Sequence, residues 1–128
     1  MQTIYQESEN GRFTHKGKKY NLNEVFKLTH IKPINKLKVS DLEWILEFSY
    51  EEKDGVLVCR SCRKGPAGWH EQRVNDADLN TPIIAIFEDQ HWIVLDGVHR
   101  LQKAKNLGVV ELPVKVIDDG ELESCLYT

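Results

Sequence analysis

The stretch Trp92-Ile-Val-Leu-Asp-Gly-Val-His-Arg-Leu-Gln-Lys-Ala104 decides the fold of this chain. Its first four residues are an apolar run, which predicts a strand ending near Leu95. An Asp-Gly pair follows, and residues 99–107 then carry apolar residues at helical spacing, with Gly108 as the expected terminator. The sequence therefore predicts a strand, a tight turn and a helix in that order.

The start of this helix is a candidate anion site. The first turn of any helix has backbone N–H groups without intrahelical partners and the positive end of the helix dipole, which together favour phosphate. Gly97 permits a close backbone approach at the turn. The sequence predicts a phosphate-binding turn made by the backbone of Gly97 and Val98 and by the side chains of His99, Arg100 and Lys103.

Asp96 has several candidate roles in this turn. A carboxylate repels phosphate unless a metal or a proton lies between them, so Asp96 is a catalytic or Mg²⁺-binding candidate. It could instead cap the helix or orient Arg100. The alternative interpretation of the whole segment is a tight turn followed by an exposed basic helix.

The Asp96-Gly-Val-His-Arg100 motif resembles the ParB/sulfiredoxin superfamily, in which many ParB-like proteins and the free-serine kinases carry Asp-Gly-x-His-Arg. Residues 78–86 look like the lead-in and preceding strand, and residues 112–117 look like the final strand, so the resemblance covers roughly residues 70–118. It implies an α+β fold, with a small mixed sheet and packed helices. We expect one domain over 1–128, with an N-terminal extension and hairpin at 1–30 and a core at 31–118.

The resemblance also implies a function. It predicts a nucleotide-binding domain that holds a di- or triphosphate (ATP, ADP or CTP) with Mg²⁺, for phosphoryl transfer or NTP hydrolysis. Its partner would be a nucleotide or a phosphorylated small molecule. Two alternatives remain: a ParB-like nuclease or DNA-processing protein with DNA as partner, and a non-catalytic accessory binding module. Val98 stands where sulfiredoxins have their nucleophilic cysteine, which argues against sulfiredoxin reductase activity.

The segment before the lead-in supplies further candidates, because in the relatives it borders the phosphate pocket. His70 or Glu71 could act as a general base, and Arg73 as a second phosphate ligand. Trp69 could stack on a base, whereas the neighbours of Trp44 indicate a core position. A solvated polar helix explains residues 70–73 equally well.

Cys59 and Cys62 form a CxxC motif, with His70 further along the chain. These three residues fall short of the four ligands of a closed structural zinc site. Cys125 lies far away near the C-terminus. We therefore expect plain thiols and no zinc. A zinc site here would have an open position and would favour metal-assisted hydrolysis.

Composition limits the remaining possibilities. The 128 residues carry a net charge of −3 and are 41% hydrophobic, which fits one globular core and gives no global nucleic-acid signature. The three cysteines, the absence of a signal-peptide pattern and the lack of an apolar run of ~18 residues predict a cytoplasmic protein with no membrane partner. The oligomeric state does not follow from the sequence.

Local patterns predict the other elements. We expect a hairpin over 12–22 turning at Lys16-Gly17, and a short helix capped by Asn23. A capping box at 40–43 predicts a helix from Asp41. Strands are expected at 37–39 and 56–59, a hairpin at 83–95, and a long loop at 60–75. The acidic tail from Asp118 is expected to fray.

Overall fold

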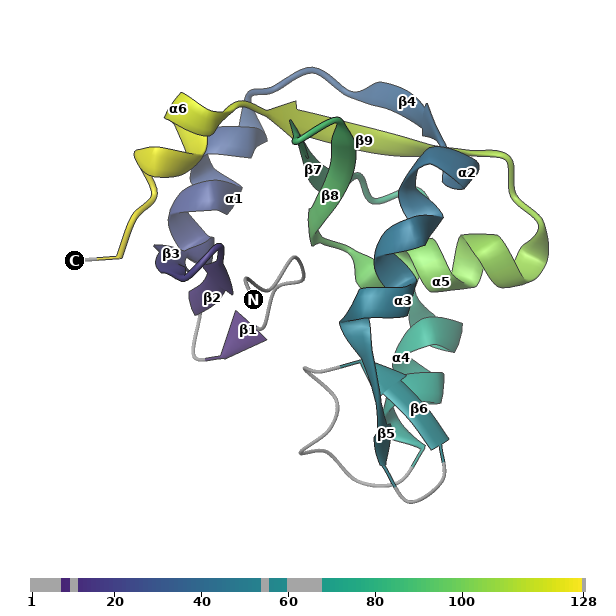
Figure 1. Ribbon diagram of the computed structural model, residues 1–128. Coiled ribbons are helices and arrows are strands. Elements are labelled where there is room, and N and C mark those ends of the chain that lie inside the picture. The colour runs from purple at the N-terminus through teal and green to yellow at the C-terminus, as the bar shows by residue number, and fades with distance from the viewer. Residues whose placement is uncertain (1–7, 10–11, 54–55, 60–67, 128) are drawn as a thin grey trace.

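A computed structural model of the chain describes residues 8–9, 12–53, 56–59 and 68–127 (Figure 1). Its centre is a four-stranded sheet in the order β4-β9-β7-β8, which comprises Asn35–Lys38, Glu111–Ile117, Ile83–Glu88 and His91–Asp96 respectively. Strand β9 runs parallel to β7 and antiparallel to β4, and β8 is antiparallel to β7. The sheet is mixed, and helices pack against it, so the predicted α+β class is confirmed.

The decisive stretch forms the predicted strand–turn–helix unit. Strand β8 ends at Asp96, and helix α5 spans Val98–Leu107 with Gly97 as its N-cap residue. Gly108 ends the helix in the left-handed conformation, with φ +73°. Because β7 and β9 are parallel, the chain must cross over between them, and α5 is the helix in that crossover.

The N-terminal region contains the predicted hairpin. Strands β1 (Ser8–Glu9), β2 (Arg12–His15) and β3 (Lys18–Asn21) form an antiparallel sheet that turns at residues 16–17. Helix α1 then spans Leu22–His30. The expected cap was wrong by two residues, because the side chain of Asn21, not Asn23, accepts the N–H of Glu24.

The region after β4 departs further from expectation. Helical turns α2 (Val39–Leu42), η1 (Glu43–Ile45) and α3 (Leu46–Ser49) follow one another. Helix α2 begins at Val39, with Lys38 as an N-cap residue that makes no side-chain capping bond, so the predicted capping box at 40–43 is wrong. Val39 and Leu42 are buried, and their burial sets the helix start.

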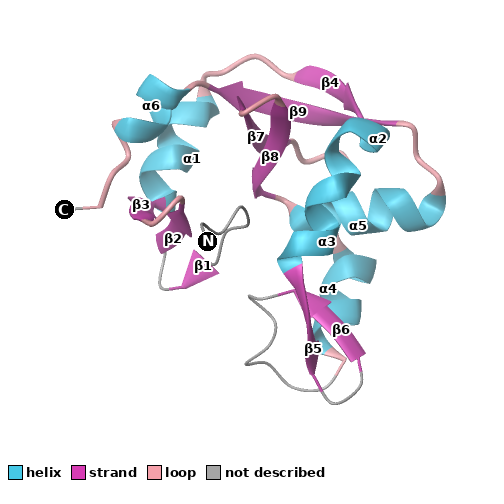
Figure 2. Cartoon of the chain, in the orientation of Figure 1, coloured by secondary structure: helices cyan, strands magenta, loops and turns pink. Residues whose placement is uncertain are grey.

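A second hairpin and a further helix complete this half of the molecule (Figure 2). Strands β5 (Tyr50–Lys53) and β6 (Val56–Cys59) pair antiparallel, which confirms the strand at 56–59. Helix α4 covers Trp69–Asp76, so the long loop predicted at 60–75 is wrong for its second part. Residues 70–73 lie in this helix, where His70 is buried and residues 71–73 are exposed, so the expectation of a solvated polar helix holds for three of the four residues.

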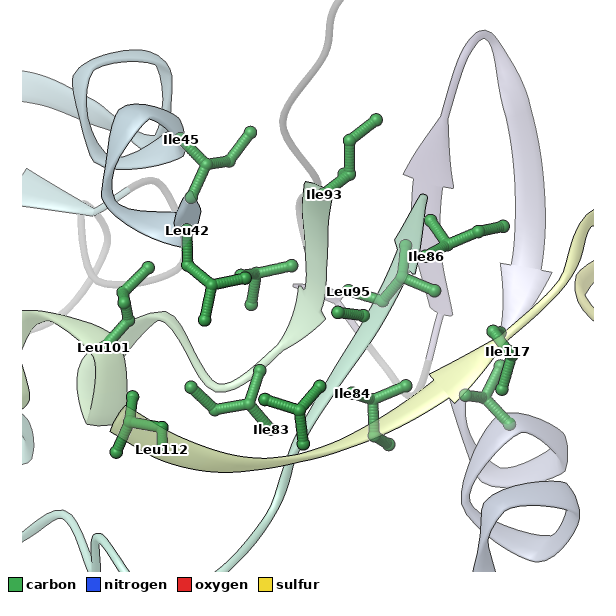
Figure 3. Packing of buried hydrophobic residues seen from close by; sticks show 14 of the residues in the cluster. Leu42, Ile45, Ile83, Ile84, Ile86, Ile93, Leu95, Leu101, Leu112 and Ile117 are labelled. Atoms are coloured by element: carbon green, nitrogen blue, oxygen red, sulfur yellow. The ribbon is translucent and has the colours of Figure 1, made fainter. Parts of the chain in front are cut away.

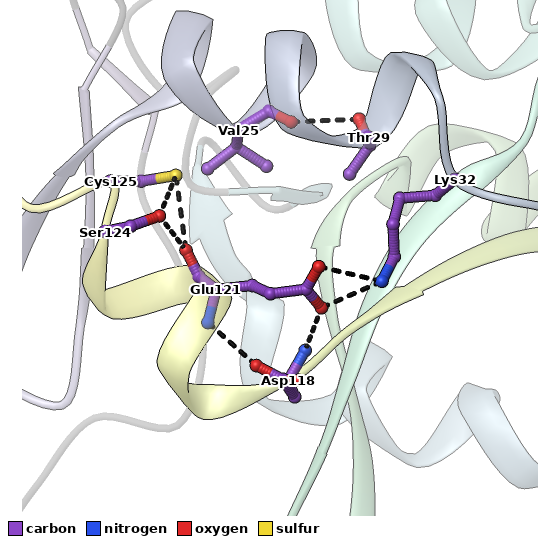
Figure 4. A network of polar contacts seen from close by, with 7 residues as sticks. All are labelled: Val25, Thr29, Lys32, Asp118, Glu121, Ser124 and Cys125. Carbon is purple, nitrogen blue, oxygen red and sulfur yellow. Dashed lines mark hydrogen bonds and ion pairs between the residues drawn. The ribbon is translucent and has the colours of Figure 1, made fainter.

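The acidic tail is ordered by a polar network (Figure 4). Helix α6 spans Asp119–Glu123, and Asp118 and Glu121 form a capping box at its start. The Glu121 carboxylate also accepts hydrogen bonds from Lys32 Nζ, at 2.9 Å to Oε1 and 2.8 Å to Oε2. The prediction that the tail frays is therefore wrong, because these bonds anchor α6 to the end of α1.

A single apolar cluster runs through the molecule. Its members in the sheet and in the helices interdigitate around β7 and β9 (Figure 3), and they include Leu42, Ile83, Ile86, Leu101 and Ile117. The β1–β3 sheet, α1 and α6 lie at one end of the central sheet, whereas α2–α5 and the β5–β6 hairpin lie at the other (Figure 1). The turn into α5 is thereby fixed between the central sheet and the second group.

Candidate functional site

The turn between β8 and α5 requires glycine. Gly97 has φ +115°, a conformation that L side chains rarely adopt. A Cβ added there would lie 2.8 Å from Ile83 Cγ1 and 3.3 Å from Ile83 Cβ. The absence of a side chain thus lets the turn pack directly on the first residue of β7.

The start of α5 has no side-chain cap from Gly97. Its first intrahelical bond runs from Leu101 N to Gly97 O, at 3.0 Å, so the N–H groups of residues 98–100 precede the hydrogen-bonded part of the helix. The first turn contains no acidic residue and carries His99 and Arg100. This end of the helix is therefore electropositive.

Arg100 acts as a clamp between three segments. Its Nη1 donates to the backbone carbonyls of Thr81, at 3.2 Å, and Pro82, at 2.5 Å, and its Nη2 donates to Asp96 Oδ2 at 2.9 Å. The Arg100 side chain is 17% exposed. Of the roles considered for Asp96, the structure supports orientation of Arg100. The structure thus gives the Arg100 guanidinium three protein partners, and its role as a phosphate ligand stays a prediction.

Lys103 holds the end of α4. Its Nζ donates to the carbonyl oxygens of Asn75 and Ala77 at 2.7 and 2.8 Å. The last carbonyls of a helix lack intrahelical donors and carry the negative end of the dipole, so a lysine there satisfies both. The structure thus directs this ammonium to α4, not back to the start of its own helix as expected.

Helix α4 brings the remaining candidates to α5. The rings of His70 and His99 lie 5.1 Å apart between centroids, tilted by 49°, and His70 is 5% exposed. The Arg73 guanidinium lies 5.3 Å from the centre of the Trp69 ring, and both residues are exposed. Glu71 is also exposed, in the first turn of α4.

The structure therefore brings the predicted site residues to the α4–α5 helix pair in two groups. The first group forms the turn into α5 and consists of Asp96, Gly97, Val98 and Arg100. The second group lies on α4, and the contact between His70 and His99 joins the two groups. Trp44 lies elsewhere, as the sequence indicated: its Nε1 donates to the Trp92 carbonyl at 2.8 Å. Val98 is partly buried against the apolar core, so this residue can contribute only its backbone to a ligand.

The predicted cysteine site lies partly outside the described residues. Cys62 is in the undescribed segment 60–67, and Cys59 is the last residue of β6. Among the described residues, no group of three or more His, Cys, Asp and Glu side chains could hold a metal ion. Cys125 is buried beside α6, and burial raises the pKa of its thiol. The absence of zinc stays a prediction.

One charged cluster escaped the sequence analysis. His15 Nε2 lies 2.5 Å from Glu88 Oε1, and the Lys16 ammonium lies 2.7 Å from Asp89 Oδ2 and 3.7 Å from Glu88 Oε2. The carboxyl group of Asp119 on α6 also interacts electrostatically with Glu88. Lys16 thus connects the N-terminal hairpin to the β7–β8 turn.

The electrostatics of this cluster follow from its contacts. Burial would raise the pKa of Glu88, but the hydrogen bond with His15, the interaction with Asp119 and the charges of His15 and Lys16 outweigh it, so the pKa lies below its ordinary value. The interaction with Glu88 raises the pKa of Asp119. The hydrogen bond to Asp89 raises the pKa of Lys16. These contacts therefore favour the ionised form of the Glu88 carboxyl group.

Comparison with protein-family models, with curated proteins and with solved structures gives no match to this chain. The ParB/sulfiredoxin resemblance therefore stays an interpretation of the residues around the β8–α5 turn. No described helix is long and apolar enough to cross a membrane.

Proposed function

We propose that this domain binds a phosphate-bearing ligand, a nucleoside di- or triphosphate in particular, at the start of α5. The observation that carries the proposal is the geometry of the β8–Gly97–α5 turn. A rigid strand and a left-handed glycine fix the first turn of a helix that lacks a side-chain cap, and the Asp96 carboxylate beside this turn is paired with Arg100. Backbone N–H groups in such a turn bind phosphate oxygens well.

In this proposal, each side chain near the turn has a separate role. His99 is the first-turn residue that donates to phosphate, and the buried ring of His70 positions it from α4. Arg100 and Asp96 act as positioning residues, because their mutual bond and the bonds to residues 81 and 82 hold the turn in place. Lys103 keeps α4 against α5.

The exposed side of α4 could contact the rest of the nucleotide. Trp69 has an aromatic face for a base, although Arg73 lies over the same ring at 5.3 Å. A nucleotide would therefore have to displace or share that guanidinium. If the domain also transfers or hydrolyses phosphate, Glu71 is the accessible base, since it is exposed and His70 is not.

The α5 turn offers a single carboxylate as a ligand for Mg²⁺. Asp96 is a single carboxylate, and one of its oxygens already accepts Arg100. Mg²⁺ is commonly bound through one or two carboxylates together with substrate phosphates. In this proposal the ion would arrive with the nucleotide, and Asp96 would supply one further oxygen, with the ion neutralising phosphate charge.

The test is a calorimetric titration with ADP, ATP and CTP, each with and without Mg²⁺. We expect binding that His99→Ala weakens by about tenfold or more, because the change removes one hydrogen bond to a charged group, which is worth roughly 1.5–3 kcal/mol. His30→Ala is the matched control, since His30 is exposed on α1. Equal affinities for the two variants, or no binding by the unaltered chain, would refute the proposal.

The nuclease alternative makes a different prediction. It requires basic side chains leading away from His99 to follow a nucleic-acid backbone. The ammonium of Lys103 is bound to the end of α4, and the exposed lysines of β4 lie at the opposite edge of the sheet from β8. We therefore favour the nucleotide. Tight, salt-sensitive DNA binding in the absence of nucleotide affinity would reverse that preference.

A further inference from the structure

Positive charge is concentrated in two segments of a chain whose balance is acidic, residues 12–19 and residues 25–40. Residues 25–40 contain four lysines and no aspartate or glutamate, although the whole chain has a net charge of −3. Two of the lysines are neutralised locally, because Lys32 binds Glu121 and Lys27 binds Glu24. The other two, Lys36 and Lys38, are exposed on β4 and form no ion pair with any described residue.

Strand β4 is an edge of the central sheet. Its strand neighbour is β9, and its outer side lies along the upper margin of the molecule in Figure 1. An edge strand presents backbone N–H and C=O groups that a further strand can pair with. Residues two apart on a strand share a face, so Lys36 and Lys38 point to the same side.

Apolar side chains precede this edge. Ile31 and Ile34, between α1 and β4, are 84% and 60% exposed. Lysines on an edge strand can serve simply to prevent aggregation. Protection alone does not account for two aliphatic side chains left in solvent beside the lysines, whereas a binding surface with apolar contacts and a positive charge does.

The positive charges of β4 favour an acidic protein segment as the binding partner. A second copy pairing through β4 would set Lys36 against Lys38, and like charges directly opposite one another are destabilising. A nucleic acid would gain from aromatic side chains more than from isoleucines. We propose that the outer edge of β4 accepts an extended, acidic segment of a partner protein as an added strand, with carboxylates opposite Lys36 and Lys38 and an apolar residue near Ile34.

The probe is a Glu–Val peptide of about six residues, long enough for one strand, with Glu at two positions two apart, Val two positions beyond them and Thr in between, so that Glu can lie opposite Lys36 and Lys38 while Val lies near Ile34. Titration at millimolar concentration into isotope-labelled protein should shift the amide resonances of β4. The double variant Lys36→Glu/Lys38→Glu should weaken binding by about tenfold, because two cross-strand attractions become repulsions. Lys18→Glu/Lys19→Glu is the charge-matched control on β3, where both lysines are exposed. Ile34→Ser should weaken binding without reversing the charge preference.

Two comparison peptides make the test decisive. A Lys–Val peptide should bind less well to the unaltered chain and better to Lys36→Glu/Lys38→Glu. An acidic peptide with proline at alternate positions cannot donate a full set of backbone bonds and should bind weakly. Equal binding of the proline peptide, equal loss in the β3 control, or no shift of β4 resonances would overturn the proposal. Concentration-dependent dimers formed through β4 would also overturn it. Failure of nucleotide binding would leave it intact, because β4 and the α5 start are separate.

Discussion

Replacement of Arg100 by alanine tests how the α5 turn is held. The change removes the donors to Thr81 O and Pro82 O and the partner of Asp96. Hydrogen bonds to a charged group are worth roughly 1.5–3 kcal/mol each, and the partial exposure of Asp96 and Thr81 reduces that value. We expect the free energy of unfolding to fall by about 2–4 kcal/mol.

The assay is urea denaturation followed by circular dichroism. Lys105→Ala is the control, because Lys105 is an exposed cation on the same helix and its removal should cost less than about 0.5 kcal/mol. The double variant Asp96→Asn/Arg100→Ala isolates the ion pair. It should be less destabilised than the sum of its single variants, since residues in contact are not additive. If Arg100→Ala unfolds at the same urea concentration as Lys105→Ala, the clamp is not what stabilises the turn.

Three further variants test the surrounding structure. The pKa of Glu88 is lowered in the folded state, so its charge stabilises the fold at pH values above the ordinary pKa of 4.5. That stability is lost as the pH falls through the lower pKa of the folded state. The urea midpoint of Glu88→Gln should therefore change less between neutral and acidic pH than the midpoint of the unaltered chain. Gly97→Ala should lower the free energy of unfolding, measured by urea denaturation, by about 1–3 kcal/mol or more. The loss should clearly exceed that of Gly17→Ala, because a Cβ at Gly17 meets nothing within 4 Å. Lys103→Met should speed hydrogen exchange of the last turn of α4, whereas Lys105→Met should not.

The parts of the fold that were predictable are those in which neighbouring residues determine the outcome. The apolar run 92–95, the Asp-Gly pair and Gly108 define a strand, a turn and a helix within 17 residues, and the structure confirms each of them. The hairpin at Lys16-Gly17 was predictable for the same reason. Strand β5 was not, since Tyr-Glu-Glu-Lys has no apolar alternation, and its pairing with β6 supplies the order.

The candidate site was predictable as a set of residues and not as a set of contacts. Sequence reasoning placed Arg100 and Lys103 near one anion because both are cations on one helix. Apart from Asp96, which lies four positions from Arg100 and was a candidate to orient it, their partners are main-chain carbonyls 18 to 28 positions away. A carbonyl is present at every residue, so no residue type signals such a partner. His15 and Glu88 are 73 positions apart, and only the tertiary fold brings them together.

The same use of cations recurs at another helix end. Lys115 of β9 donates to the carbonyls of Thr29 and His30 at the end of α1, as Lys103 does at the end of α4. Long cationic side chains in this domain thus satisfy orphan carbonyls and connect elements. In the proposed function, the phosphate would contact the backbone N–H groups of the α5 turn and His99. Substitution of Arg100 should therefore report on architecture, and substitution of His99 on binding.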